Sequence, residues 1–345
     1  MAAGKLNPRQ RIVLATIVRG HIESAQPVGS RWVARRCGLG LSPASIRNCM
    51  MDLEEMELLT HLHTSGGRLP THAGYRVFVD ELMGRGTLPG ATRRRVEDSL
   101  REGRAGSLET LLDQACTLLG QISEQLSVVL SPRYDKSRVD RIELNQVDER
   151  RLLVVFRMAS GLERTVVAGM PDDIGEDDMR QTLQIMNGVA RGRTLADLVA
   201  LRDDEEVRVM LRGLRVASSV YAGARELEND ESNEHFHMWG ASNMLSQPEF
   251  EDPSRLRGVF RALEQRQTLY GLFEPTRHRR SVSITIGEEN EVEELRDCSV
   301  VSVSYRFGEF GGSVGVIGPA RMPYEFVVSI VDHVAQTVGR ILVPQ

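Results

Sequence analysis

Residues 8–83 alternate between short stretches with apolar residues at helical spacing and stretches rich in turn-forming residues. The first stretch begins at Pro8 and places four apolar side chains on one helix face: Leu14, Ile17, Val18 and Ile22. A second helix is expected from Ser30. A third is expected from Ser42, a side-chain cap followed by proline at the first helical position. Three helices separated by a turn and a glycine break indicate a helix-turn-helix.

The pattern changes after Leu59, where a short strand, a glycine turn and a return strand ending at Pro70 are expected. Such a hairpin directly after the third helix converts a helix-turn-helix into a winged helix. Thr71 is expected to cap a last helix with apolar residues along one side: Tyr75, Phe78, Val79 and Leu82. Residues 84–106 begin with a glycine- and proline-rich stretch and are assigned to a linker, which leaves residues 1–83 as the N-terminal domain.

The remainder of the chain mixes helix and strand patterns. One long amphipathic helix is predicted over 108–129, and strands are predicted over 139–147, 152–158 and 163–170. Residues 172–235 are acidic and helix-prone; strands then return near 282–286, 301–305 and 314–317, and a helix closes the chain over 324–342. Strands on both sides of a helical segment predict an α+β multidomain protein. One domain (107–171 and 236–345) would be interrupted by another (172–235).

Charge separates the two ends of the chain. The 345 residues carry a net charge of −5, yet residues 1–80 hold ten lysines and arginines against six aspartates and glutamates. A basic N-terminal segment on an acidic remainder is expected when only that segment meets nucleic acid. Chance placement of arginine is an equally good explanation if charge is considered alone.

Composition excludes other classes of protein. With 41% hydrophobic and 26% charged residues the chain is a globular protein, not a disordered one. The longest uninterrupted apolar run, 152–156, is too short to span a membrane, and no signal peptide is recognisable. The four cysteines are far apart and form no CxxC pair, which is typical of reduced, buried thiols in a cytosolic protein.

The third helix carries the most specific candidate site. Its core face is centred on Ile46 and Leu53, so four residues point away from the core: Ala44, Arg47, Asn48 and Met51. Arginine and asparagine suit guanine and adenine edges in the major groove, while small or apolar neighbours suit a thymine methyl group. Acidic residues gather in the C-terminal half of the helix, so the N-terminal half would approach DNA. A solvated helix face is the alternative, and the flanking turn and hairpin favour DNA reading.

Other basic residues flank this helix. Three arginines of the second helix would hold phosphates without reading sequence: Arg31, Arg35 and Arg36. Arg68, in the return strand, either reaches a phosphate or the minor groove or is an ordinary solvated turn residue. His61 and His63 lie two residues apart without a third ligand, which favours a place beside the hairpin over a metal site.

The rest of the chain offers no comparable catalytic pattern. The glycine-rich segment 311–318 lacks the Gly-Lys-Ser/Thr ending of a phosphate loop and fits a turn that leads into a buried strand. His235 and His237 have no HExxH or CxxC partner. We therefore expect neither enzyme activity nor a metal or cofactor.

Longer motifs identify a family. In the N-terminal region they are Gln26–Ser30, Leu41–Asn48, Leu53–Glu54, His63–Thr71 and Gly74–Arg76; later they are Gly240–Asn243, Pro248–Phe250, Ile286–Asn290 and Gly315–Met322. These segments resemble the HrcA heat-inducible transcription repressors over essentially the whole chain. The sequence departs from the usual pattern at Ser45, Gly66, Leu69, Ala320 and Pro323, and residues 172–235 match weakly.

The resemblance implies a homodimeric bacterial repressor that binds double-stranded DNA at an inverted-repeat operator, CIRCE, upstream of chaperone operons. It also implies a winged helix joined to a GAF-like domain, an inserted dimerisation domain at 172–235, and dependence on the GroE chaperonin. Motif and helix face together give these candidate DNA-binding residues: Ser42, Ala44, Ser45, Arg47, Asn48, Met51, Arg31, Arg35, Arg36, His63, Ser65 and Arg68. The expected location is the cytoplasm, at the nucleoid, without a membrane partner.

Two other functions stay open. One is a winged-helix regulator whose GAF-like domain senses a small ligand, which a pocket with convergent polar groups would support. The other is an enzyme with a DNA-binding head, which a titratable pair in a cleft would support.

Overall fold

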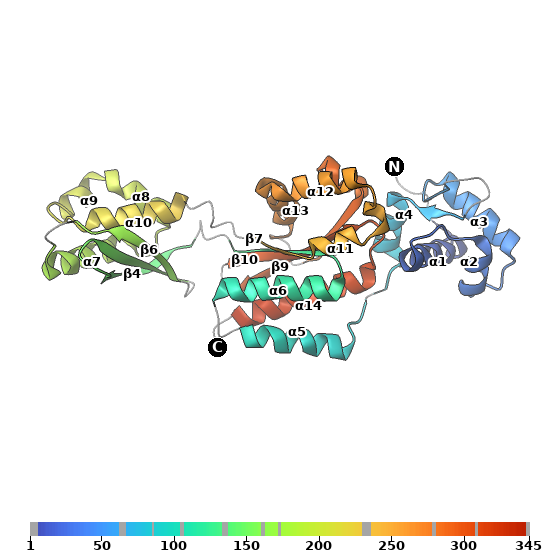
Figure 1. Ribbon diagram of the computed structural model, residues 1–345, viewed down its shortest axis with the longest axis horizontal. Helices are drawn as coiled ribbons and strands as arrows, with labels where there is room; N and C mark the ends of the chain where they lie inside the picture. Colours follow the sequence, from blue (N-terminus) through green and yellow to red (C-terminus); the bar gives the residue numbers. More distant parts are fainter. Residues whose placement is uncertain are drawn as a thin grey trace. The chain divides into compact units, whose positions relative to one another are not determined.

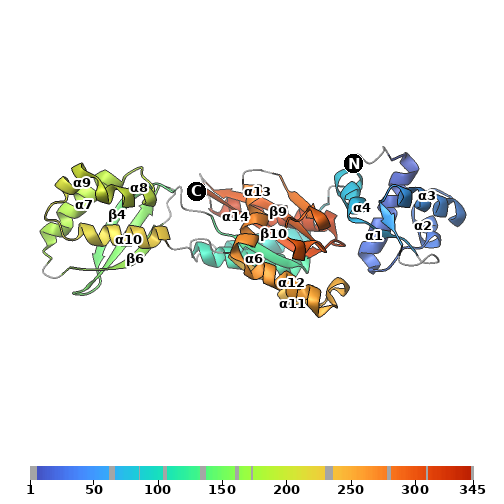
Figure 2. The same ribbon diagram turned by 90° about the horizontal axis from the view of Figure 1, so that it is seen from above.

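The computed structural model describes residues 6–61, 67–84, 86–103, 107–132, 137–159, 163–171, 174–229, 236–277, 281–307 and 310–342. The chain divides into two compact units, each with helices and sheets (Figures 1 and 2). The first contains Met1–Leu130, Phe236–Tyr305 and Ser313–Gln345, and the second contains Ser131–His235 and Arg306–Gly312. The prediction of a mixed α+β protein is confirmed.

The N-terminal part of the first unit, residues 6–84, is called the head below. Its elements are α1 (Pro8–Ser24), α2 (Ser30–Arg36), α3 (Pro43–Glu55), β1 (Leu59–Thr60), β2 (Leu69–Pro70), α4 (His72–Val77) and a π-helical turn, η1 (Phe78–Leu82). Asn7 caps α1, and Thr71 caps α4 by accepting a 3.0 Å hydrogen bond from the Gly74 N–H. These side-chain oxygens satisfy N–H groups that a helix start leaves without partners.

The head has its own apolar core and a small sheet. Ile17, Ile46 and Leu53 are fully buried, as the helical spacing predicts. β1 pairs with β2 in antiparallel register, and the backbones of Val28 and Arg68 exchange two hydrogen bonds of 2.9 Å. The turn between α1 and α2 is therefore joined to the hairpin.

The rest of the first unit, called the body below, is built on a five-stranded sheet. The strand order is β7 (Phe236–Trp239), β3 (Leu126–Leu130), β10 (Phe310–Pro319), β9 (Cys298–Phe307) and β8 (Ser283–Ile286). Helices α12 (Pro253–Glu264) and α13 (Arg266–Arg277) pack on one face (Figure 1). The opposite side carries α5 (Gly90–Gly103), α6 (Leu108–Ser123) and α14 (Tyr324–Leu342). A short helix, α11 (Ala241–Leu245), follows β7.

Two expectations for the body were wrong. The helix predicted over 108–129 ends at Ser123, because Glu124 adopts a left-handed conformation (φ 55°), and the apolar run after it is the fully buried strand β3. The linker predicted over 84–106 contains α5, whose Val96 and Leu100 are fully buried. An exposed linker has no such apolar anchors.

The second unit combines a three-stranded sheet with helices. Its strands are β4 (Val139–Gln146), β5 (Arg151–Met158) and β6 (Glu163–Gly169), in that order. Its helices are α7 (Glu176–Ala190), α8 (Leu195–Ala200), α9 (Glu205–Met210) and α10 (Ala217–Asn229). The strands and helices expected along 139–229 are confirmed.

The expected boundary of the interrupting segment, however, was wrong. The three strands were assigned to the domain that contains the C-terminal strands, yet they pair only with one another among the described residues. Leu152, Val154 and Phe156 share a single apolar core with residues of α7, α8 and α10. The interruption therefore begins near Ser131, not at residue 172.

Two further findings concern membrane spans and cysteines. No helix among the described residues has the length and apolar character needed to cross a membrane. All four cysteines are free and buried, as expected: Cys37, Cys49, Cys116 and Cys298.

Candidate nucleic-acid interface

The start of α3 is fixed by its own sequence. The Ser42 hydroxyl oxygen accepts a hydrogen bond of 3.1 Å from the Ser45 N–H, and Pro43 occupies the first turn. The core side of the helix is buried: Ile46, Cys49, Met50 and Leu53. The expected outward face is confirmed as solvent-exposed, and it contains Ala44, Arg47, Asn48 and Met51. Its contact with DNA stays a prediction.

Charge on this face is concentrated at Arg47. Within the described part of the chain its guanidinium has neither an ion pair nor a hydrogen bond, so its donors are free for a partner. The acidic residue Glu54 lies one to two turns further along α3 and is already engaged by Arg68 at 2.8 Å. The N-terminal half of α3 therefore presents an available cation, together with the partial positive charge of a helix start.

The three arginines of α2 are not equivalent. Arg31 and Arg35 are exposed and, among the described residues, unpaired. Arg36 donates to Glu23 at 2.9 Å and stacks over Trp32, with 4.4 Å between its guanidinium carbon and the ring centroid. Arg31 and Arg35 are thus the better candidates for phosphate contacts.

Arg9 is a basic residue beside α3 that sequence reasoning missed. It is exposed, and its guanidinium donates a hydrogen bond of 2.5 Å to the Ser45 carbonyl oxygen at the start of α3. A lone arginine at the start of α1 carries no sequence signal for this placement, because only the packing of α1 on α3 brings the two helix starts together.

Arg68, the arginine of the hairpin, is paired within the head. The Arg68 side chain is only 12% exposed, and its Nε donates to the Glu54 carboxylate, which also contacts His61. This pairing favours a structural role over the phosphate or minor-groove contact considered for Arg68. Two other candidate DNA-binding residues, His63 and Ser65, lie outside the described residues.

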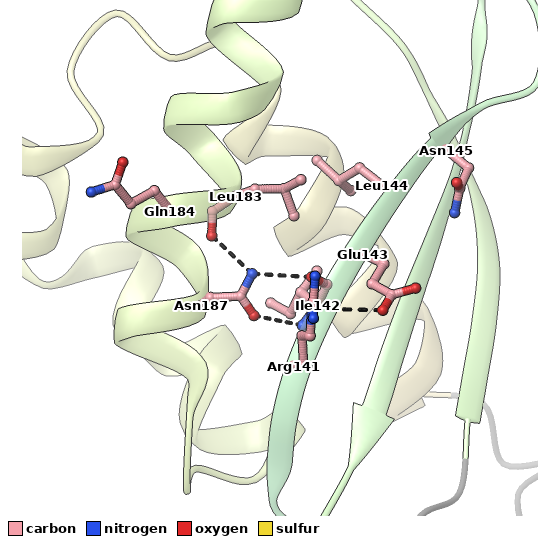
Figure 3. A pocket seen from close by; sticks show the side chains of 8 residues that line it. All are labelled: Arg141, Ile142, Glu143, Leu144, Asn145, Leu183, Gln184 and Asn187. Carbon is pink, nitrogen blue, oxygen red and sulfur yellow. Dashed lines mark hydrogen bonds and ion pairs between the residues drawn. The ribbon is translucent and has the colours of Figure 1, made fainter.

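A hollow of about 690 Å³ lies in the second unit between β4 and α7. Figure 3 shows that Asn187 points at β4, where its amide exchanges hydrogen bonds with the Ile142 backbone of 2.7 and 3.0 Å. The amide thus replaces a strand partner at this sheet edge and protects it from further pairing. The Asn187 amide is used within the fold, and the hollow lies in the second unit, not in the body for which a ligand sensor was considered.

One histidine and two carboxylates link the sheet of the body to α6. His237 on β7 contacts Glu109 at 3.0 Å and Asp113 at 3.4 Å, both on α6. Burial lowers the histidine pKa, but the two carboxylates outweigh it and the pKa is raised. These groups join β7 to α6, and no group of three or more such side chains among the described residues could hold a metal ion. The arrangement gives no support to an enzyme.

Comparison with known proteins extends the resemblance. The family model for the HrcA protein C-terminal domain matches residues 109–328. Heat-inducible transcription repressor HrcA of Symbiobacterium thermophilum is 34% identical, covering 96% of this chain and 97% of that protein. The corresponding repressor of Desulforamulus reducens is 32% identical, covering 98% and 97%. A crystal structure of a hypothetical protein shares the fold, with a TM-score of 0.63 at 21% identity over 98% of this chain and 99% of that one. The chain belongs to the HrcA family.

Proposed function

We propose that this protein is a negative regulator of heat-shock (chaperone) operons that binds a CIRCE-type inverted repeat as a homodimer. The head would act as a winged helix, with α3 in the major groove and the hairpin beside it. The body would be the GAF-like domain, and the second unit the inserted dimerisation domain. The names of the relatives, heat-inducible transcription repressor, support the regulatory role.

One observation carries the DNA-reading part. The outward face of α3 combines an arginine without a partner among the described residues (Arg47), an exposed amide (Asn48) and an exposed apolar side chain (Met51, 48% exposed). These are the side-chain types that read guanine, adenine and thymine in the major groove. Arg31 and Arg35 on the preceding helix would hold the phosphates on either side.

A second observation supports self-association through the second unit. On β5, alternate residues pack against the helices, while Leu153 faces the other side of the sheet, directly opposite Val167 of β6. Val167 is 50% exposed, although valine in a sheet is usually covered. A second copy of this unit would cover the apolar pair, and a two-fold dimer matches an inverted repeat.

The remaining parts of the proposal concern the cell. We propose a cytoplasmic location at the nucleoid and maintenance of the active fold by the GroE chaperonin, as the family resemblance implies. No cofactor or metal is part of the proposal.

The proposal is tested by footprinting the purified protein on the DNA upstream of its own gene. We expect a protected inverted repeat with two equivalent halves; uniform weak protection at all positions would refute sequence-specific reading. Light scattering tests the dimer. Val167→Arg is expected to give monomers, while Val209→Arg, at a 64% exposed position on α9, serves as the matched control and should stay dimeric. A dimer that survives Val167→Arg would place the interface elsewhere.

A further inference from the structure

The head and the body meet through residues that lie far apart in sequence. Arg76 on α4 donates from Nε to Glu289 Oε1 at 2.8 Å, and another of its nitrogens donates to the Ile284 carbonyl oxygen at 2.7 Å. The Glu289 carboxylate also accepts the Ile286 N–H at 3.0 Å, so it is held in place before Arg76 reaches it. A planar guanidinium with several fixed acceptors has one favourable orientation.

A second arginine makes the reciprocal contact from the body. Arg321 donates from Nε to Glu249 at 2.6 Å and from Nη2 to Gln247 at 2.8 Å. Its Nη1 donates to the Ile22 carbonyl oxygen in the last turn of α1, at 3.2 Å. Carbonyl groups in the last turn of a helix lack intrahelical partners and favour a nearby cation. The Arg321 side chain is only 14% exposed, so its donors depend on these acceptors.

Two glycines also lie in close contact with neighbouring elements, Gly287 with the head and Gly86 of the connecting segment with α14. Gly287 adopts a left-handed conformation (φ +60°), and a Cβ there would lie 2.2 Å from Nδ1 of His72 in the head. A Cβ at Gly86 would lie 1.9 Å from the Glu325 carbonyl oxygen. The rings of Tyr75 and Tyr324 lie 6.0 Å apart between centroids. A side chain at Gly287 would displace the His72 ring of the head, and a side chain at Gly86 would displace the connecting segment from α14.

Without these contacts only a short segment would join the two parts. Residues 83–89 separate η1 from α5 and contain no helix or strand among those described. Seven residues span up to about 25 Å when extended, which is enough to move α3 by most of a turn of DNA. The contacts of Arg76 and Arg321, together with the Arg19–Glu325 ion pair of 2.9 Å between α1 and α14, therefore fix the direction in which α3 points more tightly than the covalent connection does.

We propose that Arg76 and Arg321 are positioning residues that fix the DNA-reading helix on the body and thereby set the half-site spacing that a dimer accepts. This inference rests on the proposed binding of an inverted repeat by a dimer. In such a dimer the distance between the two α3 helices must equal the distance between half-site centres along the DNA. A rigid junction accepts one spacing, whereas a flexible one accepts several and binds each more weakly.

The test uses the full-length protein and a series of inverted repeats whose half-sites are moved apart in steps of one base pair. We expect the unsubstituted protein to favour one spacing by about tenfold or more. Arg76→Ala and Arg321→Ala should reduce this preference to about threefold or less, while affinity for a single half-site stays within about twofold. The exchange Arg76→Glu with Glu289→Arg should restore part of the preference, because it re-forms the ion pair although it loses the hydrogen bonds to the Ile284 and Ile286 backbone, and a purely structural defect would allow no recovery.

Arg11→Ala is the matched control, because Arg11 pairs with Glu81 inside the head and should leave the spacing preference unchanged. Circular dichroism checks that each variant is folded. If a single substitution unfolds the head, the spacing preference is measured on the charge-exchange variant instead. An unchanged spacing preference in both alanine variants, or an equal loss of single half-site binding, would overturn the inference. Failure of the unsubstituted protein to bind any half-site would instead overturn the proposed function.

Discussion

The Glu54 carboxylate of α3 accepts a hydrogen bond of 2.8 Å from Nε of Arg68 in the hairpin. The two side chains are 23% and 12% exposed, so the pair is shielded from water. The pair connects the helix proposed to read DNA with the segment directly before β2. The backbone pairing of Arg68 with Val28 extends this connection to the turn before α2. The hairpin is thereby placed relative to α3 before any DNA arrives.

Replacement of Arg68 should therefore reduce stability more than it changes DNA electrostatics. We expect Arg68→Ala to lower the free energy of unfolding by about 1–3 kcal/mol, because it leaves the part-buried Glu54 carboxylate with His61 as its remaining partner. Urea unfolding measures this loss. The dependence of DNA affinity on salt should stay unchanged; a clearly smaller salt slope would show that Arg68 contacts a phosphate after all.

Arg47 and Asn48 are predicted to contact base edges. Arg47→Ala or Asn48→Ala should cost about 1–3 kcal/mol of specific binding and leave affinity for random DNA nearly unchanged. Fluorescence anisotropy on the operator and on a scrambled duplex measures both affinities. If Arg47→Ala weakens both duplexes equally, the assignment of α3 as the reading helix is wrong.

Arg35 and Arg36 form a matched pair on α2. We expect Arg35→Ala to weaken binding to all sequences alike and to reduce the salt slope by about 0.9, the value for one released phosphate contact. Arg36→Ala should have a smaller effect, because Arg36 is already paired with Glu23 and stacked on Trp32. Titrations at several salt concentrations distinguish them, and equal slopes for both variants would contradict the assignment.

His21 is expected to make the stability of the head depend on pH. Its Nδ1 lies 2.5 Å from the Tyr75 hydroxyl, with Arg321 and Glu249 as the neighbouring charges. Burial, and then the Arg321 charge, lower its pKa from 6.5 to about 4. As pH falls from about 6.5 to about 4, the unfolded state takes up a proton that the folded state refuses, so stability falls over this interval.

The measurement is the urea midpoint of the unsubstituted protein and of His21→Gln between pH 7.5 and pH 4.5. Carboxylates titrate in both proteins, so the difference between them isolates the histidine. We expect the unsubstituted protein to lose more stability than the variant as the pH falls. Parallel curves would show that His21 does not carry this dependence.

Local patterns in the sequence predicted local structure well. The caps Ser42 and Thr71, the buried face around Ile46, and strand β5 follow from nearest neighbours along the chain, and the structure confirms them. The helix predicted through residue 129 was wrong, because a run of apolar residues has no period that separates a buried strand from a helix. Only the pairing of β3 with β7 and β10 decides between them.

Long-range contacts could not be predicted in this way. Nothing near Arg76 in the sequence identifies Glu289 as its partner, and Arg9 gives no sign that it reaches Ser45. The strands β4–β6 were assigned to the wrong part of the chain for the same reason, since strand periodicity does not reveal which sheet a strand joins. The outward face of α3, by contrast, depends on a single helix and could be predicted.

Heat is expected to reduce repression, and the topology of the body suggests a mechanism. β3 pairs with β7 through Val128 and Met238 and with β10 through Val128 and Gly315. The central sheet can therefore form only when strands from both sides of the interrupting unit come together. Distant pairing of this kind slows folding and leaves apolar strands exposed on the way. Such a chain would compete with other unfolded proteins for chaperonin, and repression would fall when heat saturates the chaperonin.

We therefore expect GroE chaperonin with ATP to raise the yield of DNA-binding protein after dilution from denaturant, without changing the affinity of each active dimer. Stoichiometric titration with operator DNA gives the yield of DNA-binding protein, and the dissociation constant gives the affinity of each active dimer. Chaperonin without ATP is the control. A change in stability of about 1–2 kcal/mol is enough to alter the active fraction several-fold. Equal recovery with and without chaperonin at physiological temperature would refute the mechanism, and a small-ligand signal would then be the better explanation of induction.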